Sequence, residues 1–332
     1  MNYIQIPDVC VRKHIMPTIY LDSCAMIELA RYKNGKCTDA HKKEIEELYA
    51  LLASMMQEKR ILCPLGNQLQ EMGMTKDREK AKLFLYEFTN SEFCHPDIIR
   101  NKQLKIGYKA YTSKEKTVVL DSSVVFREDK NLGSPFVVHV APVYSTEKAE
   151  SLRQEKHHIV DILNEMKEGK KVKEDFNSQL QAELESEYIL FMQNVVNNSL
   201  SSETDFENYA DEINSFYRIT GLNPSSEPEK HAEGAVSYTE FLLGPYHDLL
   251  PYIWTRASLW AHLMQRSNRI VQGDNLDVQW AAAYLPFVNY AVTDGAFCKL
   301  LHESGLADLY GTKVYSFRTL NSLIDELKRI DE

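Results

Sequence analysis

The chain has 332 residues, 44% of them hydrophobic and 26% charged, which is the balance of a globular protein with one large domain or two ordinary ones. Its 48 Asp and Glu residues outnumber its 38 Lys and Arg residues, so it does not bind nucleic acid by bulk charge alone. This acidic balance does not exclude a nuclease, whose site is itself acidic and recruits cations.

The six cysteines are widely scattered and include no CxxC pair, which indicates reduced thiols instead of a disulfide framework or a zinc site. The N-terminal segment has no apolar core suited to a signal peptide, and no charge-free apolar run is long enough to cross a bilayer. We therefore expect a soluble, cytoplasmic protein with no membrane partner.

The first third of the chain alternates short apolar runs with stretches of helical periodicity. This pattern predicts strands over residues 18–21 and 60–64 and helices over 25–31, 40–58, 66–74 and 77–90.

The middle of the chain has a different character. Residues 117–126 and 135–143 are typical of strands, which form a hairpin or add one strand to the main sheet. Residues 146–197 form a charged helical region with a break near Gly169, and 199–228 are typical of surface connections around a short helix.

The last third returns to alternating elements. We expect strands over residues 289–293 and 313–317, and helices over 238–272, 278–285, 295–303 and 320–330. Short strands alternating with helices predict an α/β fold with a mostly parallel sheet.

Four acidic residues stand near the ends of predicted strands or the starts of helices: Asp22, Glu71, Asp277 and Asp294. Because the carboxyl ends of parallel strands meet at one rim, these side chains can converge. Two carboxylates 4 Å apart repel by about 4 kcal/mol at an effective dielectric of about 20. A cation or raised pKa values relieve that repulsion, and oxygen ligands without His or Cys favour Mg²⁺ or Mn²⁺.

These segments carry a family resemblance. The chain resembles the PIN-like nuclease superfamily in IYLDSCAMIEL around Asp22, CPLGNQLQEM around Glu71, DNLDVQWAAAYLPFVNYAVTD ending at Asp294, and the tail KVYSFRTLNSLIDEL. The resemblance implies a three-layer α/β/α domain with a central, mostly parallel sheet, formed by residues 15–95 and 240–332. Residues 96–239 would then be a mainly helical insertion, longer than such domains usually carry.

The function implied by the resemblance is metal-dependent endonuclease activity, most often the hydrolysis of single-stranded RNA. The catalytic and metal-binding residues would be Asp22, Glu71, Asp277 and Asp294, with Glu71 either ligating metal or orienting a water. Weaker candidates for substrate contacts are Ser23, Thr293, Arg256 and Arg269.

Several alternatives stay open at this point. Asp22 can be a plain helix N-cap, and Asp274 can replace or join Asp277. The domain can also be a non-catalytic scaffold that binds RNA or protein. DNA as substrate, an inhibitor or antitoxin protein as partner, and a homo-oligomer are all compatible with the sequence.

Two other enzyme classes are excluded. A phosphatase of the haloacid dehalogenase type needs a second Asp two residues after the first, where this chain has Cys24. P-loop and dinucleotide-binding enzymes need glycine-rich turns, and neither GxxxxGK nor GxGxxG occurs.

Overall fold

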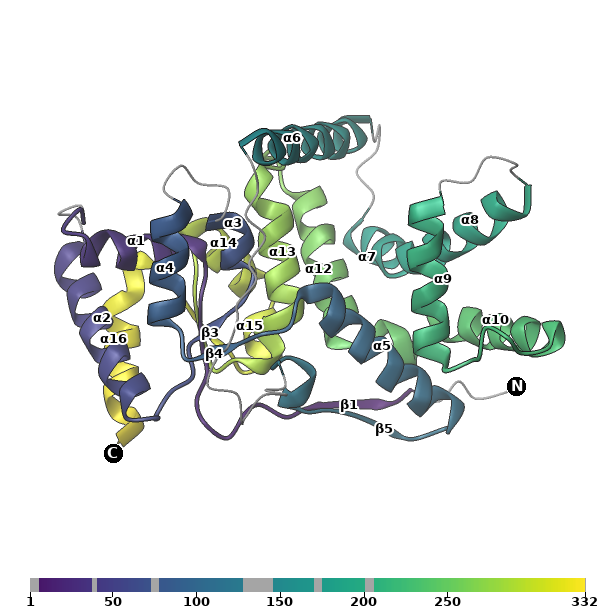
Figure 1. Cartoon of the computed structure of the whole chain (residues 1–332), viewed down its shortest axis with the longest axis horizontal. Coiled ribbons are helices and arrows are strands. Elements are labelled where there is room, and N and C mark those ends of the chain that lie inside the picture. Colours follow the sequence, from purple (N-terminus) through teal and green to yellow (C-terminus); the bar gives the residue numbers. More distant parts are fainter. Residues whose placement is uncertain are drawn as a thin grey trace.

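The computed structural model describes residues 6–37, 41–72, 78–127, 146–169, 175–200 and 206–331. In this part of the chain the fold is mixed α/β, with many helices and small parallel sheets (Figure 1). None of the described helices combines the length and the apolar character that crossing a membrane requires.

The strands are β1 (Asp8–Val11), β2 (Ile19–Leu21), β3 (Pro64–Leu65), β4 (Ser91–Glu92), β5 (Thr117–Leu120), β6 (Tyr290–Val292) and β7 (Lys313–Tyr315). The α-helices are α1 (Ser23–Lys33), α2 (Lys42–Gln57), α3 (Gln68–Met72), α4 (Arg78–Phe88), α5 (Pro96–Thr112), α6 (Thr146–Gly169), α7 (Phe176–Leu184), α8 (Ser186–Leu200), α9 (Phe206–Thr220), α10 (Pro228–Leu242), α11 (Pro245–Asp248), α12 (Pro251–Gln265), α13 (Gln272–Tyr284), α14 (Gly295–Glu303), α15 (Leu306–Leu309) and α16 (Leu320–Lys328).

The sheet that organises the fold joins the two ends of the chain. Strand β6 lies between β2 and β7, and all three are parallel. In this register Leu21, Val292 and Tyr315 lie side by side at the carboxyl ends of the strands. Strand β3, paired with β4, continues the sheet beyond β2 through a parallel bridge between Thr18 and Leu62.

Helices cover both faces of this sheet. Ile19 and Leu21 pack into one buried cluster with side chains of α1, α2 and α16, whereas Tyr20 packs into a second cluster with α12 and α13. Each fully buried Leu or Ile stabilises the fold by about 1.5–3 kcal/mol relative to exposure. In Figure 1, α1, α2 and α16 lie on one side of the strands, and α12 and α13 lie on the other.

The hairpin predicted in the middle of the chain stays a prediction, because only its first strand is described. Strand β5 pairs in parallel with β1, a strand that the sequence pattern did not predict, in a separate two-stranded sheet. The second predicted strand of the hairpin, 135–143, lies outside the described residues. The short helix expected within 199–228 is α9, which has 15 residues.

Prolines and caps explain the largest differences in helix boundaries. The single helix expected over 238–272 is divided into α10, α11 and α12, because Pro245 and Pro251 each begin a new helix. Helix α13 begins at Gln272 and not near 278, so Asp277 lies inside the helix instead of at its start.

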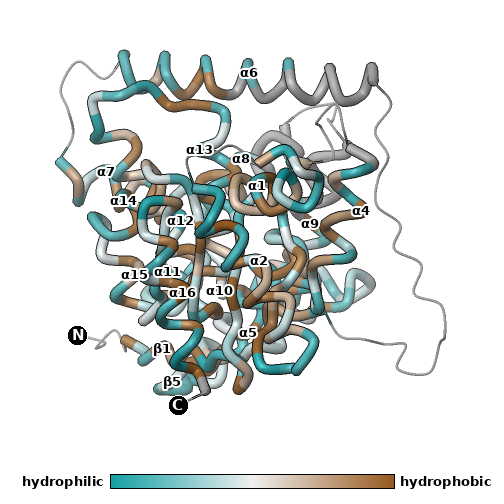
Figure 2. The backbone as a smooth tube through the Cα atoms, turned by 90° about the vertical axis from the view of Figure 1, so that its left-hand side faces the viewer, coloured by the Kyte–Doolittle hydropathy of each residue, from teal (hydrophilic) through white to brown (hydrophobic). Residues whose placement is uncertain are grey.

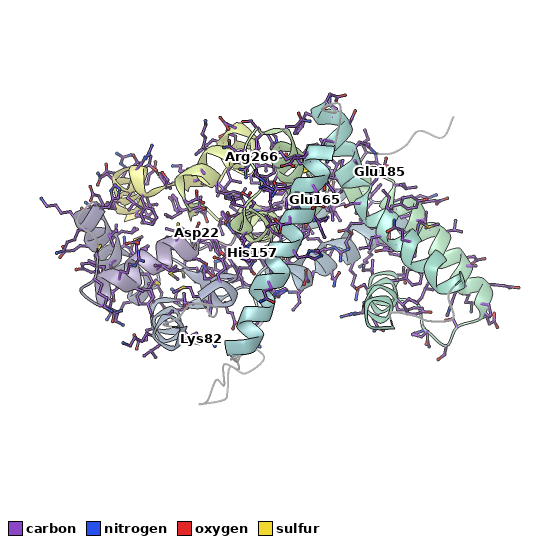
Figure 3. All side chains as sticks on the ribbon, turned by 90° about the horizontal axis from the view of Figure 1, so that it is seen from above. Asp22, Lys82, His157, Glu165, Glu185 and Arg266 are labelled. Atoms are coloured by element: carbon purple, nitrogen blue, oxygen red, sulfur yellow. The ribbon has the colours of Figure 1, made fainter. Side chains whose placement is uncertain are left out.

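Helix α6 lies across the upper side of the molecule, above α12 and α13 (Figures 1 and 2). Two of its polar side chains fix it there. Asn164, which is buried, exchanges hydrogen bonds of 2.9 and 3.0 Å with the backbone of Ile270. Lys167 Nζ donates to the carbonyl oxygens of Leu263 and Asn268, at the carboxyl end of α12, where a cation is favourable. Seen from above, α6 runs between the part of the molecule that holds Asp22 and the part that holds Glu185 (Figure 3).

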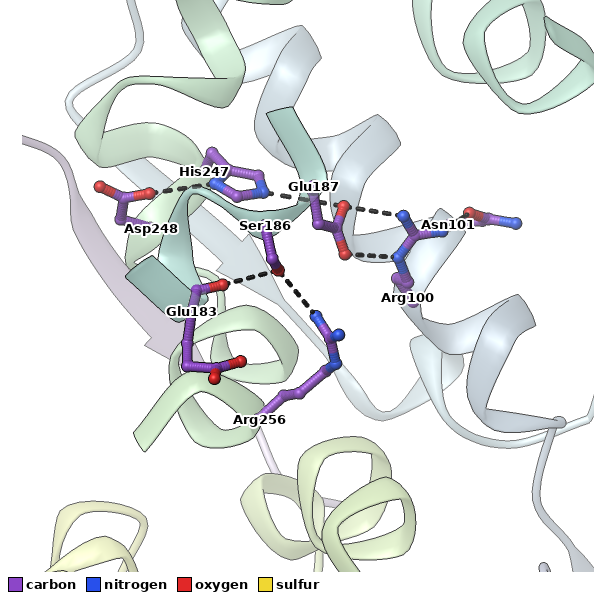
Figure 4. Close-up of polar contacts among 8 residues, drawn as sticks. All are labelled: Arg100, Asn101, Glu183, Ser186, Glu187, His247, Asp248 and Arg256. Atoms are coloured by element: carbon purple, nitrogen blue, oxygen red, sulfur yellow. Dashed lines mark hydrogen bonds and ion pairs between the residues drawn. The ribbon is translucent and has the colours of Figure 1, made fainter. Parts of the chain in front are cut away.

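A buried polar network joins α5, α8 and α11 (Figure 4). Arg100 donates two hydrogen bonds, of 2.6 and 2.8 Å, to the buried carboxylate of Glu187. His247, which is 0% exposed, lies 3.0 Å from Asp248 Oδ1 and 3.8 Å from Glu187 Oε2. A buried charge without a partner would lower the stability of the fold. Removing one member of the network would therefore leave the charge of another uncompensated.

Protonation of His247 should make stability depend on pH. Burial alone would lower the pKa of His247, but the carboxylates of Asp248 and Glu187 outweigh burial, and the pKa is raised. A histidine whose pKa is higher in the folded than in the unfolded chain stabilises the fold. This stabilisation is complete below the unfolded-state pKa of about 6.5, and it is lost as the pH rises through the folded-state pKa. We expect His247→Gln to lower the free energy of unfolding more at acidic than at alkaline pH, as measured by urea denaturation. The exposed His157→Gln on α6 is the control, and an equal effect of His247→Gln at both pH values would contradict this account.

Candidate functional site

Three carboxylates converge at the carboxyl edge of the parallel sheet. Asp22 follows β2, Asp294 comes two residues after β6, and Asp277 projects from α13. One oxygen atom of each lies within 4.8 Å of the others. The structure therefore brings together three of the four acids singled out in the sequence, from elements at opposite ends of the chain.

Backbone hydrogen bonds of the sheet continue to the site and fix its position. The amide of Asp22 donates to the carbonyl of Val292 at 3.0 Å, and the amide of Thr293 donates to the carbonyl of Tyr315 at 3.0 Å. These bonds hold the first residue after each strand at the rim of the sheet, where crevices of open α/β folds place ligands.

Asp22 and Asp294 are also helix N-caps, so the structural and functional interpretations of these acids coexist. Asp22 Oδ1 accepts from the amide of Ala25 at 3.1 Å at the start of α1. Asp294 Oδ1 accepts from the amides of Ala296 and Phe297 at 2.7 and 3.1 Å at the start of α14. Both caps use Oδ1, so the N-cap bonds leave the second oxygen of each carboxylate out.

The alternative between Asp274 and Asp277 has a geometric answer. Asp274 caps α13 by accepting from the amide of Val271 at 2.7 Å, and it forms an ion pair with Arg266. Asp277 belongs to the convergent group, and its Oδ1 accepts a hydrogen bond of 3.3 Å from the indole of Trp280. Asp277, and not Asp274, is therefore the acid of α13 that faces Asp22 and Asp294.

Glu71 lies beside the three acids without joining them. It is half-buried on α3, and its charge contributes to the raised pKa of Asp277. Gln68, at the start of the same helix, places α3 here: its amide nitrogen donates to the carbonyl of Leu21, and its oxygen accepts from the amide of Gly66 at 2.6 Å. The sequence pattern did not single out Gln68, because a buried amide has no recognisable spacing.

Aromatic rings form the floor of the site. Tyr20 stacks on Trp280 with ring centroids 4.9 Å apart and lies 5.1 Å from Tyr284. A Cβ atom at Gly66 would lie 2.9 Å from the ring of Tyr284, so only glycine fits this close approach. The rings exclude water from beneath the acids and so increase the cost of charging them.

Burial and repulsion by neighbouring carboxylates make Asp22 and Asp277 hard to ionise. Burial raises the pKa of Asp22, and the charge of Asp294 adds to this, while contacts with Cys24, Thr293 and the amide of Ala25 oppose it. Burial first, and then the charges of Asp22, Glu71 and Asp294, together raise the pKa of Asp277 to about 8. A group of carboxylates with raised pKa values is a common feature of functional sites.

Two small side chains beside Asp22 complete the surroundings. Burial and the charge of Asp22 raise the pKa of the Cys24 thiol, so this thiol stays protonated in the metal-free protein. The hydroxyl of Thr293 is 0% exposed and favours the charged form of Asp22, yet it meets no hydrogen-bond partner of good geometry among the described residues. A buried hydroxyl without a partner at such a rim calls for a ligand or a water.

Of the weaker candidates from the sequence, Thr293 lies beside Asp22, whereas the two arginines lie elsewhere. Ser23 is buried as the first residue of α1. Arg256 donates to Ser186 Oγ at 3.4 Å in a groove of about 770 Å³ that also contains Asn275 and Gln279, on the face of α13 opposite Asp277. Arg269 is exposed on the surface, 3.8 Å from Glu168. The structure thus places neither arginine with the three acids.

Known proteins give no further guidance. Comparisons of the chain with protein-family models, with curated proteins and with solved structures found no match. The chemistry of the site must therefore be argued from its own geometry.

The donor set fits a hard divalent cation. The converging ligand atoms are carboxylate oxygens, and the thiol of Cys24 and the hydroxyl of Thr293 lie beside Asp22. Mg²⁺ and Mn²⁺ prefer such oxygen donors, and a cation would relieve the repulsion that raises the pKa of Asp277.

Removing one charge from the site should stabilise the metal-free protein. The pKa of Asp277 is about 8 in the folded chain and about 3.9 in the unfolded chain. Between these two pH values the folded state binds a proton that the unfolded state has released. The free energy of unfolding therefore falls as the pH rises from about 3.9 to about 8. We expect Asp277→Asn to raise the free energy of unfolding above pH 8 and to change it little near pH 5, in urea denaturation with a chelator present. The exposed Asp325→Asn on α16 should show no such difference, and a destabilised Asp277→Asn protein at alkaline pH would contradict the repulsion.

Proposed function

We propose that this protein is a divalent-metal-dependent endonuclease that hydrolyses phosphodiester bonds of single-stranded RNA. The convergence of Asp22, Asp277 and Asp294 within 4.8 Å carries the proposal, because a bound cation relieves the repulsion among carboxylates that lie so close together. The cofactor is Mg²⁺ or Mn²⁺. The cytoplasmic location and an inhibitor or antitoxin partner stay predictions.

The arrangement of layers supports a PIN-like, three-layer α/β/α domain. The parallel sheet β2–β6–β7 has α1, α2 and α16 on one face and α12 and α13 on the other. The acids follow β2 and β6 or lie on α13, in the order that the resemblance to that superfamily implies. The larger helical part between residues 96 and 239 would be an insertion in that domain.

In this proposal each residue of the site has a defined task. Asp22, Asp277 and Asp294 would hold the metal, which when bound supplies an activated water and stabilises the leaving oxygen. The N-cap bonds of Asp22 and Asp294 fix both carboxylates before any ligand arrives, so little ordering is needed on binding. Glu71, whose charge acts on Asp277, would orient a water or accept its proton. The hydroxyl of Thr293 is placed to donate to a ligand oxygen beside Asp22.

A non-catalytic scaffold is the competing function. A scaffold has no use for one buried and two half-buried acids in mutual repulsion, because they reduce stability without a ligand. The retained cluster therefore favours the enzyme.

The cleavage experiment uses Asp22→Asn. Asparagine still accepts from the amide of Ala25 as an N-cap, so the variant should fold, while the lost charge removes a metal ligand. We expect the wild-type protein to cleave a labelled single-stranded RNA with Mn²⁺ or Mg²⁺, and Asp22→Asn to lower kcat by about a hundredfold or more. The exposed Asp308→Asn on α15 should cleave like the wild type. Metal-independent cleavage, or full activity of Asp22→Asn, would disprove the mechanism.

Metal binding can be tested without any substrate. Since a ligand that binds only the folded state stabilises it, Mn²⁺ at about 100 times its Kd should add about 2.7 kcal/mol and raise Tm. We expect this rise in thermal denaturation of the wild-type protein and of Asp308→Asn, and its loss when Asp22 and Asp277 are both changed to Asn. An equal rise in the double variant would place the metal elsewhere.

A further inference from the structure

A second pocket lies at the opposite edge of the sheet from the acids. It has a volume of about 650 Å³ and is lined by residues of β1, the start of α12 and the segment around α15. Pro286, which lines it, precedes β6, whereas Asp294 follows that strand. Figure 1 shows β1 on the lower side of the molecule, away from α6. The volume is within the range of about 300–1,000 Å³ typical of small-molecule sites.

The walls of this pocket are apolar and include flat rings. Trp254 and Tyr310 line it together with Val9, Val11 and Leu309. Leu309 is 59% exposed, so its apolar side chain stands at the open side of the pocket. The hydroxyl of Tyr310 is occupied, since it lies 2.8 Å from Thr255 Oγ1, so its ring face is what the pocket can use.

One cation, Lys13, belongs to the lining of this pocket. Its Nζ donates to the carbonyl of Gly311 at 2.9 Å and to Thr312 Oγ1 at 3.1 Å. An ammonium group has three donors, and only these two meet an acceptor among the described residues. Burial lowers the pKa of Lys13 to about 8, because the ammonium has lost water without gaining an anion.

We propose that this pocket is a binding site for a small molecule with a flat apolar body and a carboxylate, and that the carboxylate pairs with Lys13. The rings of Trp254 and Tyr310 fit the flat body, and the third N–H of Lys13 is available to the carboxylate. An anion at this place replaces the hydration that the ammonium lost on burial.

The other ionisable groups of the lining do not compete for this role. Asp8 is exposed at the rim on β1, where solvent screens its charge. Burial raises the pKa of Tyr310, so its phenol stays neutral over the pH range of binding. The affinity for a carboxylate should therefore follow the titration of Lys13 and fall as the pH rises through about 8.

The experiment compares two probes of the same shape, 2-naphthoate and the neutral naphthalene-2-carboxamide, by isothermal titration calorimetry of the full chain. We expect naphthoate to bind about tenfold or more tightly than the carboxamide at pH 7, the scale of a hydrogen bond to a charged group. Lys13→Met should abolish this preference and its pH dependence while leaving carboxamide binding unchanged, and Lys13→Arg should retain the preference. The exposed Lys299→Met on α14 is the matched control.

Three outcomes would overturn the proposal. Neither probe binds the wild-type protein, or both bind it equally, or naphthoate binding to the wild-type protein does not weaken above pH 8. The last outcome is measured on the wild-type protein alone. The proposal can therefore be disproved even if the Lys13→Met protein does not fold. The test is also independent of the nuclease proposal, since neither probe needs metal or the three acids.

Discussion

The parallel register of β2, β6 and β7 is the constraint on which the rest of the structure depends. It sets Leu21, Val292 and Tyr315 side by side, so the residues that follow these strands meet at one rim. The two hydrophobic clusters then cover the faces of the sheet, and Gln68 fastens α3 to the end of β2. A slip of one residue would turn Tyr20 to the wrong face and separate the acids.

The site shows a conflict between stability and function. Burial against Tyr20 and Trp280 and repulsion among the carboxylates both oppose ionisation, as the raised pKa values of Asp22 and Asp277 show. The N-cap bonds of Asp22 and Asp294 offset part of that cost, because they stabilise helices and hold the charges at the same time. Acids on the surface are neither buried nor crowded by other carboxylates, so they do not lower the stability of the fold in this way.

The sequence predicted the α/β class and the strands around Asp22 and Asp294, because buried apolar runs ending in Asp are distinctive. It missed β1, whose pairing with β5 depends on a distant partner, and it merged α10 to α12 although Pro245 and Pro251 start new helices. It could not choose between Asp274 and Asp277, because that choice depends on the ion pair with Arg266. Lys13 escaped notice, since a lone lysine has no pattern until the fold encloses it.

The order of the strands along the chain has a consequence for synthesis. Strand β2 is made well before its partner β6, and Asp277 and Asp294 follow Asp22 by more than 250 residues. The nascent chain therefore carries Asp22 for that whole interval without the two carboxylates that face it. Any ligand that needs all three carboxylates can bind only after the segment through Asp294 has left the ribosome.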